Sequence, residues 1–417
     1  MKIAFFVLAA GMGGHARSAA TIAEALANQG HKILFIGPKD SPVLQILHDK
    51  KKCKIYGLSN NCRNLICDPL LVKKTSKILR EQEVEIIHTF DQHSHAIGYF
   101  LSKILNIPIL STICGGRIKT INSLPHTRPI IVFSQELKEQ LIKMGVKIKD
   151  IIVEAARIDT KNFPLRITRK HLLQTLRIES NKKIILMVTR IAWGKEQGIY
   201  SSLKSIDYLA RRRKDFVFLL IGNIESSTIK RKILKKIKQI NRNHGRMVVV
   251  LDDKKFISNP LSTFDLADII LGIGRVSFEG MMARKPVLIV GNKGFAGIIS
   301  SKNIKELSHY NFSGRNIKNE EIRVTDIKMC LLLDSLLSDD KLRKEYASFG
   351  NVWAKKHLDV KTAAQTYNDT YRHLLTQEQQ KGHHLAHLFL KYLFFIFAPI
   401  KHYSKIALKH LFTTHSK

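Results

Sequence analysis

The stretch "KIAFFVLAAGMGGHARSAATIAEALANQGHKILFIG", residues 2–37, decides the fold. It reads as an apolar strand, a glycine-rich turn, an amphipathic helix and a second apolar strand. The helix places Ala19, Ile22 and Leu26 on one face, and Gly30 ends it. Because both strands are almost continuously apolar, they fit a parallel sheet that helices cover on both faces.

The same alternation continues along the chain. In the first half, "EIIHTF", "PILSTI" and "PIIVFS" are further apolar strands separated by helical stretches. From residue 182 onward the pattern repeats with "KKIILMV", "DFVFLLIG", "RMVVVL", "ADIILG" and "KPVLIV". The helix "STIKRKILKKIKQI" in this half has isoleucines on one face and lysines on the other. The sequence therefore predicts an α/β protein with two doubly wound, Rossmann-like domains.

Composition shifts mark the domain boundaries. The pattern breaks near "ARIDTKNFPLRITRK", where Pro164 and a basic run interrupt it, and helical sequence resumes from about residue 339. We expect four parts: a first Rossmann-like domain at 1–163, a second at 164–355, a helix at 356–378 and a basic, apolar helical tail at 379–417.

The charge balance is the unusual feature of the composition. The 417 residues suffice for two domains, and they include 69 Lys and Arg against 34 Asp and Glu, a formal charge of +35. Such an excess predicts an anionic partner: nucleic acid, acidic lipid or a phosphorylated substrate. The lysines are spread over helix faces and only 8% of residues are aromatic, which argues against a nucleic-acid-binding module.

The cysteines and the N-terminus both indicate a cytoplasmic protein. The five cysteines form no CxxC pair and no paired His/Cys spacing for zinc, and their odd number fits a reducing compartment. The start, "MKIAFFVLAAGMGG", has one lysine before an apolar run, as a weak signal peptide would. Glycines and an amphipathic helix follow at once, so we interpret it as a buried first strand.

The glycine turn "GMGGHA" matches the GxGxxA form of the dinucleotide fingerprint. That fingerprint also requires an acid at the end of the second strand, where this chain has Gly37, so the pattern disfavours NAD. Two interpretations remain. The glycines make a tight strand-to-helix turn, or Gly13 and Gly14 let the backbone approach a bound diphosphate, with Arg17 nearby on the helix.

Two cations follow the first strand of the second domain. In "VTRIAWGKEQG", Arg190 and Lys195 lie at the strand's carboxyl end, where open α/β sheets bind their ligands. Arginine offers a fork and lysine a point charge, a combination that suits a diphosphate. In a chain this basic, two solvated loop charges are the alternative.

A third candidate site is "GIGRVSFEG", where a strand runs into a short helix. Gly274 and Arg275 stand at the helix start, where backbone N–H groups favour an anion. Glu279 would repel a phosphate, but its carboxylate can accept hydrogen bonds from the two vicinal hydroxyls of a ribose. Together these groups describe a nucleoside diphosphate. The alternative for Glu279 is an acid that complements the helix dipole.

Four polar residues crowd into "HTFDQHSH": His88, Asp91, His93 and His95. No nearby Cys/His pair completes a metal site, so we expect no metal. Asp91 and His93 are instead candidates for contacting an acceptor.

These sites, in this order, resemble the GT-B glycosyltransferases, specifically the large retaining family that includes many bacterial transferases for surface polysaccharides. The resemblance runs from Met1 to about Tyr371. The glycine turn is similar to the family's GG-x-x-R, "VTRIAWGKEQG" to its G-R-L…K-G segment, and "FEGMMARKPVLIVG" to E-A-M-A-x-G-K-P-V. The resemblance implies that 1–163 is the acceptor-side domain and 164–355 the nucleotide-sugar-binding domain. It also implies that Arg190 and Lys195 hold the donor diphosphate and that Glu279 binds the ribose.

The chain departs from this family at three places. The family often has two glutamates with seven residues between them, but Leu271 stands where the first would be, and the loop is shorter and contains Arg275. Cys114 stands where many relatives have a histidine facing the reacting sugar. In "ARIDTKNF", Arg157 and Ile158 replace the common Gly-Val. The first departure leaves the sugar, and activity itself, open.

The implied reaction is transfer of a sugar, with retained stereochemistry, from a nucleoside-diphosphate sugar to a cell-surface glycan or glycolipid of the lipopolysaccharide or capsule type. The resemblance implies no cofactor beyond the nucleotide-sugar co-substrate, no metal, and a last helix that crosses back to the N-terminal domain. Two alternatives stay open: a nucleotide-sugar epimerase of the same fold, and a non-catalytic membrane-associated scaffold.

The tail at 379–417 contains no acidic residue, six lysines and six histidines. Its apolar stretch Leu388–Ile400 is interrupted by Lys391 and is shorter than the roughly 20 residues of a membrane-spanning helix. Packing into the core is one alternative. An apolar stripe flanked by lysines better suits a helix lying on an anionic membrane surface. The sequence therefore predicts a cytoplasmic protein, peripheral on the inner face of the cell membrane, with a lipid-linked or membrane glycan acceptor.

Overall fold

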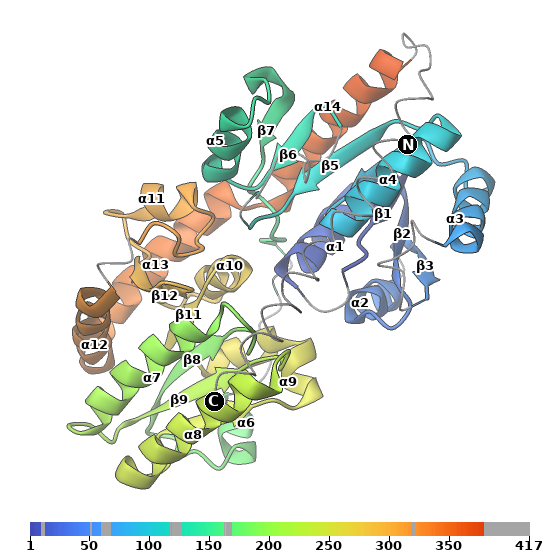
Figure 1. The fold of residues 1–417 in the computed structure, drawn as a ribbon. Coiled ribbons are helices and arrows are strands. Elements are labelled where there is room, and N and C mark those ends of the chain that lie inside the picture. Colours follow the sequence, from blue (N-terminus) through green and yellow to red (C-terminus); the bar gives the residue numbers. More distant parts are fainter. Residues whose placement is uncertain are drawn as a thin grey trace, which may run out of the picture. The chain divides into compact units, whose positions relative to one another are not determined.

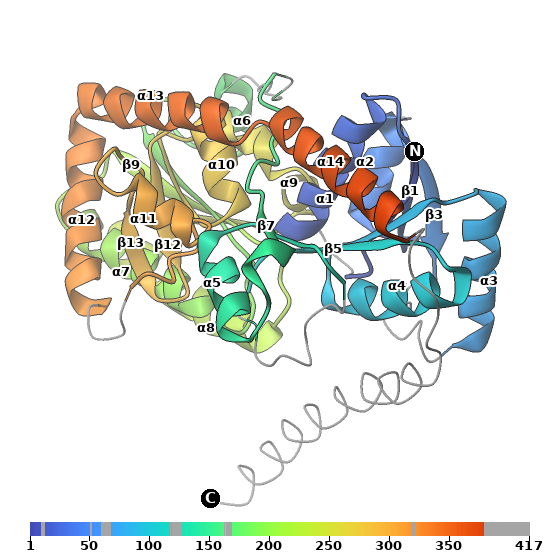
Figure 2. The same cartoon turned by 90° about the horizontal axis from the view of Figure 1, so that it is seen from above.

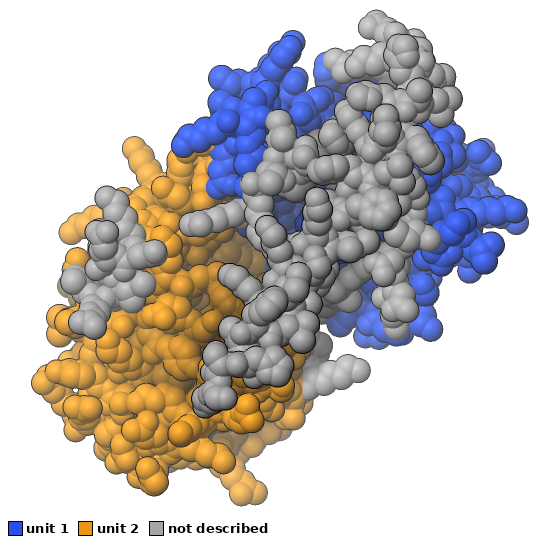
Figure 3. Space-filling view, viewed as in Figure 1, with its two compact units in different colours: residues 1–132, 140–152, 364–417 blue, residues 133–139, 153–363 orange. Residues whose placement is uncertain are grey.

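The computed structural model divides the chain into two compact units, coloured separately in Figure 3. Unit 1 comprises residues 1–132, 140–152 and 364–417, and unit 2 comprises residues 133–139 and 153–363. Helices α5 (Gln135–Lys143) and α14 (Val360–Glu378) each contribute to both. The residues that the structure describes are 1–9, 13–50, 52–59, 68–116, 118, 127–161, 163, 169–317 and 322–378.

Unit 1 is built on a seven-stranded sheet in the order β3-β2-β1-β4-β5-β6-β7. Ile3 of β1 lies opposite Ile33 of β2 and Ile86 of β4, and the pairings from β3 to β6 are parallel. The chain therefore starts in the middle of the sheet and winds outward in both directions. The strands are β1 (Lys2–Phe6), β2 (Lys32–Pro38), β3 (Lys54–Leu58), β4 (Ile86–Thr89), β5 (Ile109–Ile113), β6 (Ile130–Val132) and β7 (Ile151–Val153).

Helices cover both faces of the unit 1 sheet, because its strands are apolar on both sides. Ala4 and Phe6 of β1 pack in a cluster with Leu79 and Leu101 of two helices. Phe5, between them, points to the other face, where its ring stacks on Phe90. Figure 2 shows α3 and α4 on one side of these strands and α1, α2 and α14 on the other. The helices are α1 (Gly14–Ala27), α2 (Pro42–Lys50), α3 (Pro69–Glu81), α4 (Gln92–Leu105) and the 3-10 turn η3 (Ile148–Asp150).

A buried histidine joins α14 to the unit 1 sheet. His88 Nδ1 lies 2.7 Å from the Tyr371 hydroxyl, and His88 Nε2 lies 2.8 Å from Thr112 Oγ1. The ring of His88 also contacts those of Tyr367 and Phe90. Burial lowers the pKa of His88 well below its usual range, so the imidazole is neutral and donates one hydrogen bond while accepting the other.

Unit 2 has a six-stranded sheet in the order β10-β9-β8-β11-β12-β13. Figure 1 labels β8, β9, β11 and β12 of this sheet. All pairings are parallel except that of the edge strand β13, which runs antiparallel to β12. The carboxyl ends of five strands therefore meet at one edge, which is where such sheets bind ligands. The strands are β8 (Lys183–Val188), β9 (Phe216–Ile221), β10 (Val248–Leu251), β11 (Ile269–Gly272), β12 (Val287–Gly291) and β13 (Gly294–Ile298).

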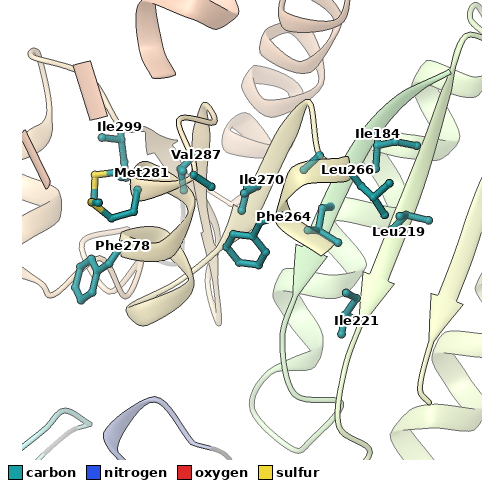
Figure 4. Packing of buried hydrophobic residues seen from close by; sticks show 14 of the residues in the cluster. Ile184, Leu219, Ile221, Phe264, Leu266, Ile270, Phe278, Met281, Val287 and Ile299 are labelled. Carbon is teal, nitrogen blue, oxygen red and sulfur yellow. The ribbon is translucent and has the colours of Figure 1, made fainter. Parts of the chain in front are cut away.

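Two apolar clusters sandwich the unit 2 sheet. Ile185 of β8 packs with residues of α7, α8 and α12, whereas its neighbour Leu186 packs with residues of α10 and α13 on the opposite face. Figure 4 shows the second cluster, in which Phe278 and Met281 lie beside Val287 and Ile299. The helices are α6 (Arg169–Thr175), α7 (Glu196–Ala210), α8 (Ser227–His244), α9 (Lys254–Ser258), η4 (Pro260–Leu266), α10 (Arg275–Met282), α11 (Ile304–His309), α12 (Ile322–Ser338) and α13 (Asp340–His357).

The predicted α/β fold with two Rossmann-like parts is confirmed. The sequence pattern did not predict the short edge strands β3, β7 and β13, nor α12 before residue 339. In the described part of the chain, no helix is long and apolar enough to cross a membrane. The predicted tail at 379–417 lies outside the described residues.

Candidate functional site

Two neighbouring loops at the carboxyl edge of the unit 2 sheet carry the predicted cations. Arg190 follows β8, and the next residue, Ile191, donates its N–H to the carbonyl of Asn223 after β9 at 2.8 Å. In return the Glu225 N–H donates to the Ile191 carbonyl at 3.0 Å. Lys195 then occupies the N-cap position of α7. The two loops are thus held side by side, and the structure brings Arg190 and Lys195 to one edge of unit 2.

Arg190 forms an ion pair with Glu225 that the sequence did not reveal. Its Nη1 lies 3.2 and 3.3 Å from the two carboxylate oxygens, and both side chains are about half exposed. An exposed pair of this kind contributes little to stability. A guanidinium forms charge-assisted hydrogen bonds with phosphates as well as with carboxylates, so an anion could take the place of Glu225. A usable sequence signal existed, because Glu225 follows β9, the strand next to β8.

Lys195 lies in a field of positive charge. Its pKa is lowered from the usual lysine range, first by burial and then by the charges of Arg190 and Arg315, against the opposing charge of Glu225. Arg315 follows Gly314, and its Nε lies 2.8 and 2.9 Å from the two carboxylate oxygens of Glu136 in the same unit. The charges of Arg190 and Arg315 thus act on Lys195, and these three residues are here called the cation cluster.

The lowered pKa of Lys195 predicts an alkaline limit on donor capture. Only the ammonium form attracts a diphosphate, so kcat/KM is expected to fall as pH rises through the lowered pKa, before an ordinary lysine would lose its proton. Because the pKa of Lys195 is lower in the folded protein than in the unfolded chain, the unfolded chain binds more protons over this pH range. The free energy of unfolding should therefore rise as the pH increases through it. The measurement is the pH profile of kcat/KM for the wild type and Lys195→Arg. An unchanged alkaline limb in Lys195→Arg, whose guanidinium stays charged, would assign the limb to another group.

The loop before α10 depends on one glycine. Gly274, the N-cap residue, has φ 57° and ψ −122°, a conformation that residues with a Cβ rarely adopt. Its N–H donates to the Phe312 carbonyl at 2.8 Å, which fixes where the helix begins. An added Cβ would meet no atom within 4 Å, so the glycine is required by the backbone angle and not by space.

Replacing Gly274 by alanine is expected to destabilise unit 2 by about 1–3 kcal/mol and to weaken donor binding, because the strained loop would relax away from the start of α10. Gly245 supplies a matched control: it has φ 83°, also has open space around its missing Cβ, and ends α8 away from this loop. We expect Gly245→Ala to lower the melting temperature similarly while leaving donor affinity unchanged. Equal donor affinities for Gly274→Ala and Gly245→Ala would contradict a role for this loop in binding.

Glu279 and Arg275 are brought together one helical turn apart. Arg275 Nε lies 2.8 Å from Glu279 Oε1, and the side chains are only 12% and 1% exposed. Arg275 Nη1 also donates to the Arg157 carbonyl at 3.1 Å. Arg275 was predicted to face an anion; in the structure its guanidinium is engaged with Glu279. The pair fixes the orientation of the carboxylate that was predicted to receive the ribose.

Arg157 is a structural neighbour of this pair that sequence reasoning did not assign to the site. Its guanidinium lies between two phenyl rings, 4.2 Å from the centroid of Phe133 and 4.4 Å from that of Phe278. It is 3% exposed, and its Nη2 donates to Asn311 Oδ1. A buried arginine stacked on both faces is strongly held. Its own carbonyl can therefore position Arg275, at a place where the resembling family has glycine.

Leu271 occupies the position of the first of the two glutamates that the resembling family often has. It lies inside β11, fully buried, opposite Leu288 of β12 and Met187 of β8. The loop between β11 and α10 is short, so the position eight residues before Glu279 falls in the core of the sheet. A carboxylate at this position would be buried among apolar side chains and would not reach a sugar.

In unit 1 the glycine turn leads directly into α1. Gly13 is the N-cap residue with φ −73°, an ordinary extended conformation, and Gly14 is the first helical residue. The backbone angle of Gly13 therefore does not require glycine. The Arg17 N–H donates to the Gly13 carbonyl at 3.1 Å, which places its side chain one turn into the helix. Gly11 lies outside the described residues.

Asp91 is a capping residue that ties two strand ends together. Its Oδ1 accepts the Ser94 N–H at 3.0 Å, which caps α4, and its Oδ2 accepts the N–H groups of Leu8 and Ala9 at 2.7 and 3.3 Å. The end of β4 is thereby joined to the chain that enters the glycine turn. His93 is exposed in the first turn of α4. The structure thus gives Asp91 a structural role and leaves the imidazole of His93 facing outward.

The remaining histidines of this segment are buried and engaged. His95 Nδ1 lies 2.8 Å from Thr89 Oγ1, and burial lowers the pKa of His95 to about 4. Cys114 Sγ lies 3.4 Å from the Phe90 carbonyl. Within the described ranges, no group of three or more His, Cys, Asp or Glu side chains is placed to hold a metal ion.

Comparison with known proteins gives one family match and several structures of similar fold. Residues 12–154 match the family model described as Glycosyltransferase Family 4. No curated protein matches the sequence significantly. The structure of Anabaena HepE with UDP and glucose is 18% identical, covering 89% of this chain and 99% of that chain, with a TM-score of 0.66.

Two further solved structures share the architecture. A glycosyltransferase from Rickettsia africae is 17% identical, covering 90% of this chain and 98% of that chain, with a TM-score of 0.64. The lipopolysaccharide outer core galactosyltransferase WaaB is 14% identical over 88% of this chain and 98% of that chain, with a TM-score of 0.53. Identities this low establish the common fold. They show that the chain has the GT-B fold, and the family model adds a sequence match over residues 12–154.

Proposed function

We propose that the chain is a retaining glycosyltransferase that moves a sugar from a nucleoside-diphosphate sugar to a cell-surface glycan or glycolipid. The observation that carries the proposal is the cation cluster, Arg190, Lys195 and Arg315, at the carboxyl edge of the sheet that also presents Glu279. Support comes from HepE, whose structure contains UDP and glucose, and from WaaB, which is named a lipopolysaccharide galactosyltransferase. Retention of stereochemistry rests on the sequence resemblance.

The chemistry requires stabilisation of a departing nucleoside diphosphate. As the bond to the sugar breaks, negative charge grows on the diphosphate, and preorganised cations lower the barrier most at that moment. Burial and then neighbouring positive charges lower the pKa of Lys195, and the negative charge of incoming phosphates would favour its ammonium form. Arg190 would exchange Glu225 for a phosphate. The N-terminus of α10 adds backbone N–H groups, and no metal or other cofactor enters the proposal.

The nucleoside end of the donor is assigned to Glu279. Its buried carboxylate, held by Arg275, is preorganised to accept hydrogen bonds from two ribose hydroxyls. In unit 1 we assign substrate binding to Gly13, Gly14 and Arg17, and an acceptor-side role to His93 and Cys114. Asp91 has an indirect role: its carboxylate caps α4 and holds the chain after β1, which fixes the positions of these residues.

Membrane association belongs to the same proposal. A tail at 379–417 lying on the inner face of the cell membrane would bring the protein to a lipid-linked acceptor. Flotation with acidic vesicles should recover the full-length protein better than a chain ending at Glu378. Equal recovery of the two would remove the tail from the proposal.

The experiment that tests the donor assignment is a thermal-shift screen of UDP-, GDP- and ADP-sugars, in which the cognate donor raises the melting temperature by mass action. Arg190→Ala should then weaken that donor by about tenfold to a hundredfold, the effect of one charge-assisted contact. Arg211→Ala, at the far end of α7, removes the same charge from an exposed site and should bind normally. Unchanged donor affinity in Arg190→Ala would refute the assignment.

A further inference from the structure

Helix α8 carries a concentrated positive charge. Its 18 residues, Ser227–His244, include seven lysines and arginines and no acidic residue. The apolar side of the helix is used for folding, since Ile229, Ile233, Ile237 and Ile240 are buried against the unit 2 sheet and α7. The cations are therefore confined to the remaining, outward surface of the helix.

Four of these cations form a single line. Arg231, Lys235, Lys238 and Arg242 follow the i, i+4, i+7, i+11 spacing, which places them within about 60° of arc at 100° per residue. The centre of this arc is roughly opposite the isoleucine face. All four are exposed, and the line extends about 16 Å along the helix. We call these four residues the α8 stripe.

The stripe is not neutralised by the protein itself. Two other lysines of α8 have acidic partners: Lys230 pairs with Asp252 and Lys236 pairs with Asp207. Within the described ranges of the chain, no member of the stripe forms an ion pair. Like charges one turn apart on a helix destabilise it slightly. An anion bound along the four cations would relieve this repulsion.

We propose that the α8 stripe is a docking surface for an anionic membrane. A line of long, flexible cationic side chains along one side of a helix can reach lipid headgroups simultaneously, with the charged ends in the headgroup layer. The helix contains no aromatic residue that could stack on a nucleic-acid base. Charge complementarity therefore favours lipid over a single-stranded nucleic acid.

The position of the stripe gives docking a consequence for the proposed function, on which this step rests. The stripe begins at Arg231, six residues after Glu225, the partner of Arg190. A membrane bound along α8 would hold the donor-site end of unit 2 close to the lipid surface. Because the apolar face of α8 is already buried, the attachment is purely electrostatic and must weaken with salt, unlike attachment by an inserted apolar tail.

The test compares full-length protein with two quadruple variants in vesicle flotation, using phosphatidylcholine vesicles with and without phosphatidylglycerol. The stripe variant is Arg231→Gln, Lys235→Gln, Lys238→Gln and Arg242→Gln. The matched control removes four exposed lysines from α13: Lys341→Gln, Lys344→Gln, Lys355→Gln and Lys356→Gln. Both variants have the same net charge, and equal melting temperatures with the wild type will show that both fold.

At about 0.1 M salt we expect the stripe variant to lose partitioning onto anionic vesicles by a hundredfold or more, since each cation contributes about fivefold. The control should lose far less, and near 1 M salt the vesicle binding of the wild type and the stripe variant should become equal.

Equal binding of wild type and stripe variant at low salt overturns the proposal, as does an equal loss in the control. A stripe variant that loses a single-stranded oligonucleotide but keeps vesicles also overturns it. Donor affinity, measured by thermal shift, stays unchanged in the stripe variant, so a failure here is distinct from a failure of the donor site.

Discussion

Replacing Lys195 by alanine is expected to lower kcat/KM by about 10²- to 10³-fold, the largest effect on catalysis that we predict. The ammonium group sits at the start of α7 beside Arg190 and Arg315, where burial makes its interaction with growing phosphate charge strong. Loss of a group that acts mainly on the leaving diphosphate should reduce kcat more than it raises KM. The measurement is steady-state kinetics with the cognate donor identified by thermal shift.

The control for Lys195→Ala is Arg211→Ala, which removes an exposed cation from the other end of the same helix. Its kinetics should match the wild type, since a surface charge this far from the cation cluster is screened. If Lys195→Ala raised KM alone and left kcat unchanged, Lys195 would be a binding residue that stabilises the bound substrate and the transition state equally. A wild-type kcat/KM in Lys195→Ala would remove it from the site.

Replacing Glu279 by alanine is expected to destabilise the protein by about 3–5 kcal/mol, the largest effect on stability that we predict. The substitution would leave the guanidinium of Arg275, which is only 12% exposed, without its carboxylate at 2.8 Å. Uncompensated buried charge is costly because little water can reach it. Chemical denaturation, with the midpoint and slope compared to the wild type, gives the free energy of unfolding.

A double variant separates the structural role of Glu279 from its assigned role in binding. Replacing both partners by apolar residues, Arg275→Met with Glu279→Leu, removes the unpaired charge and should recover much of the lost stability. Donor affinity should remain low, because no carboxylate is left for the ribose hydroxyls. Recovery of both stability and donor affinity would show that Glu279 serves only the fold.

Much of the architecture was readable from the sequence because its signals are local. Continuous apolar strands alternating with amphipathic helices predict two parallel sheets, and Arg190, Lys195 and Glu279 could be placed near strand ends from the same pattern. Even the cap at Asp91 had a local signal, since a serine follows three residues later and completes a capping box. The short edge strands β3, β7 and β13 were not predicted, because segments of three to five residues show little periodicity.

Tertiary structure decided which charges meet. The sequence by itself determined that cations and one carboxylate end up at the carboxyl edge of the second sheet. It did not determine that Glu225 pairs with Arg190, that Arg315 adds its charge to Lys195, or that Arg157 stacks between Phe133 and Phe278. These contacts join residues 24 to 121 positions apart, and their energies depend on distance and burial, which exist only once the chain has packed.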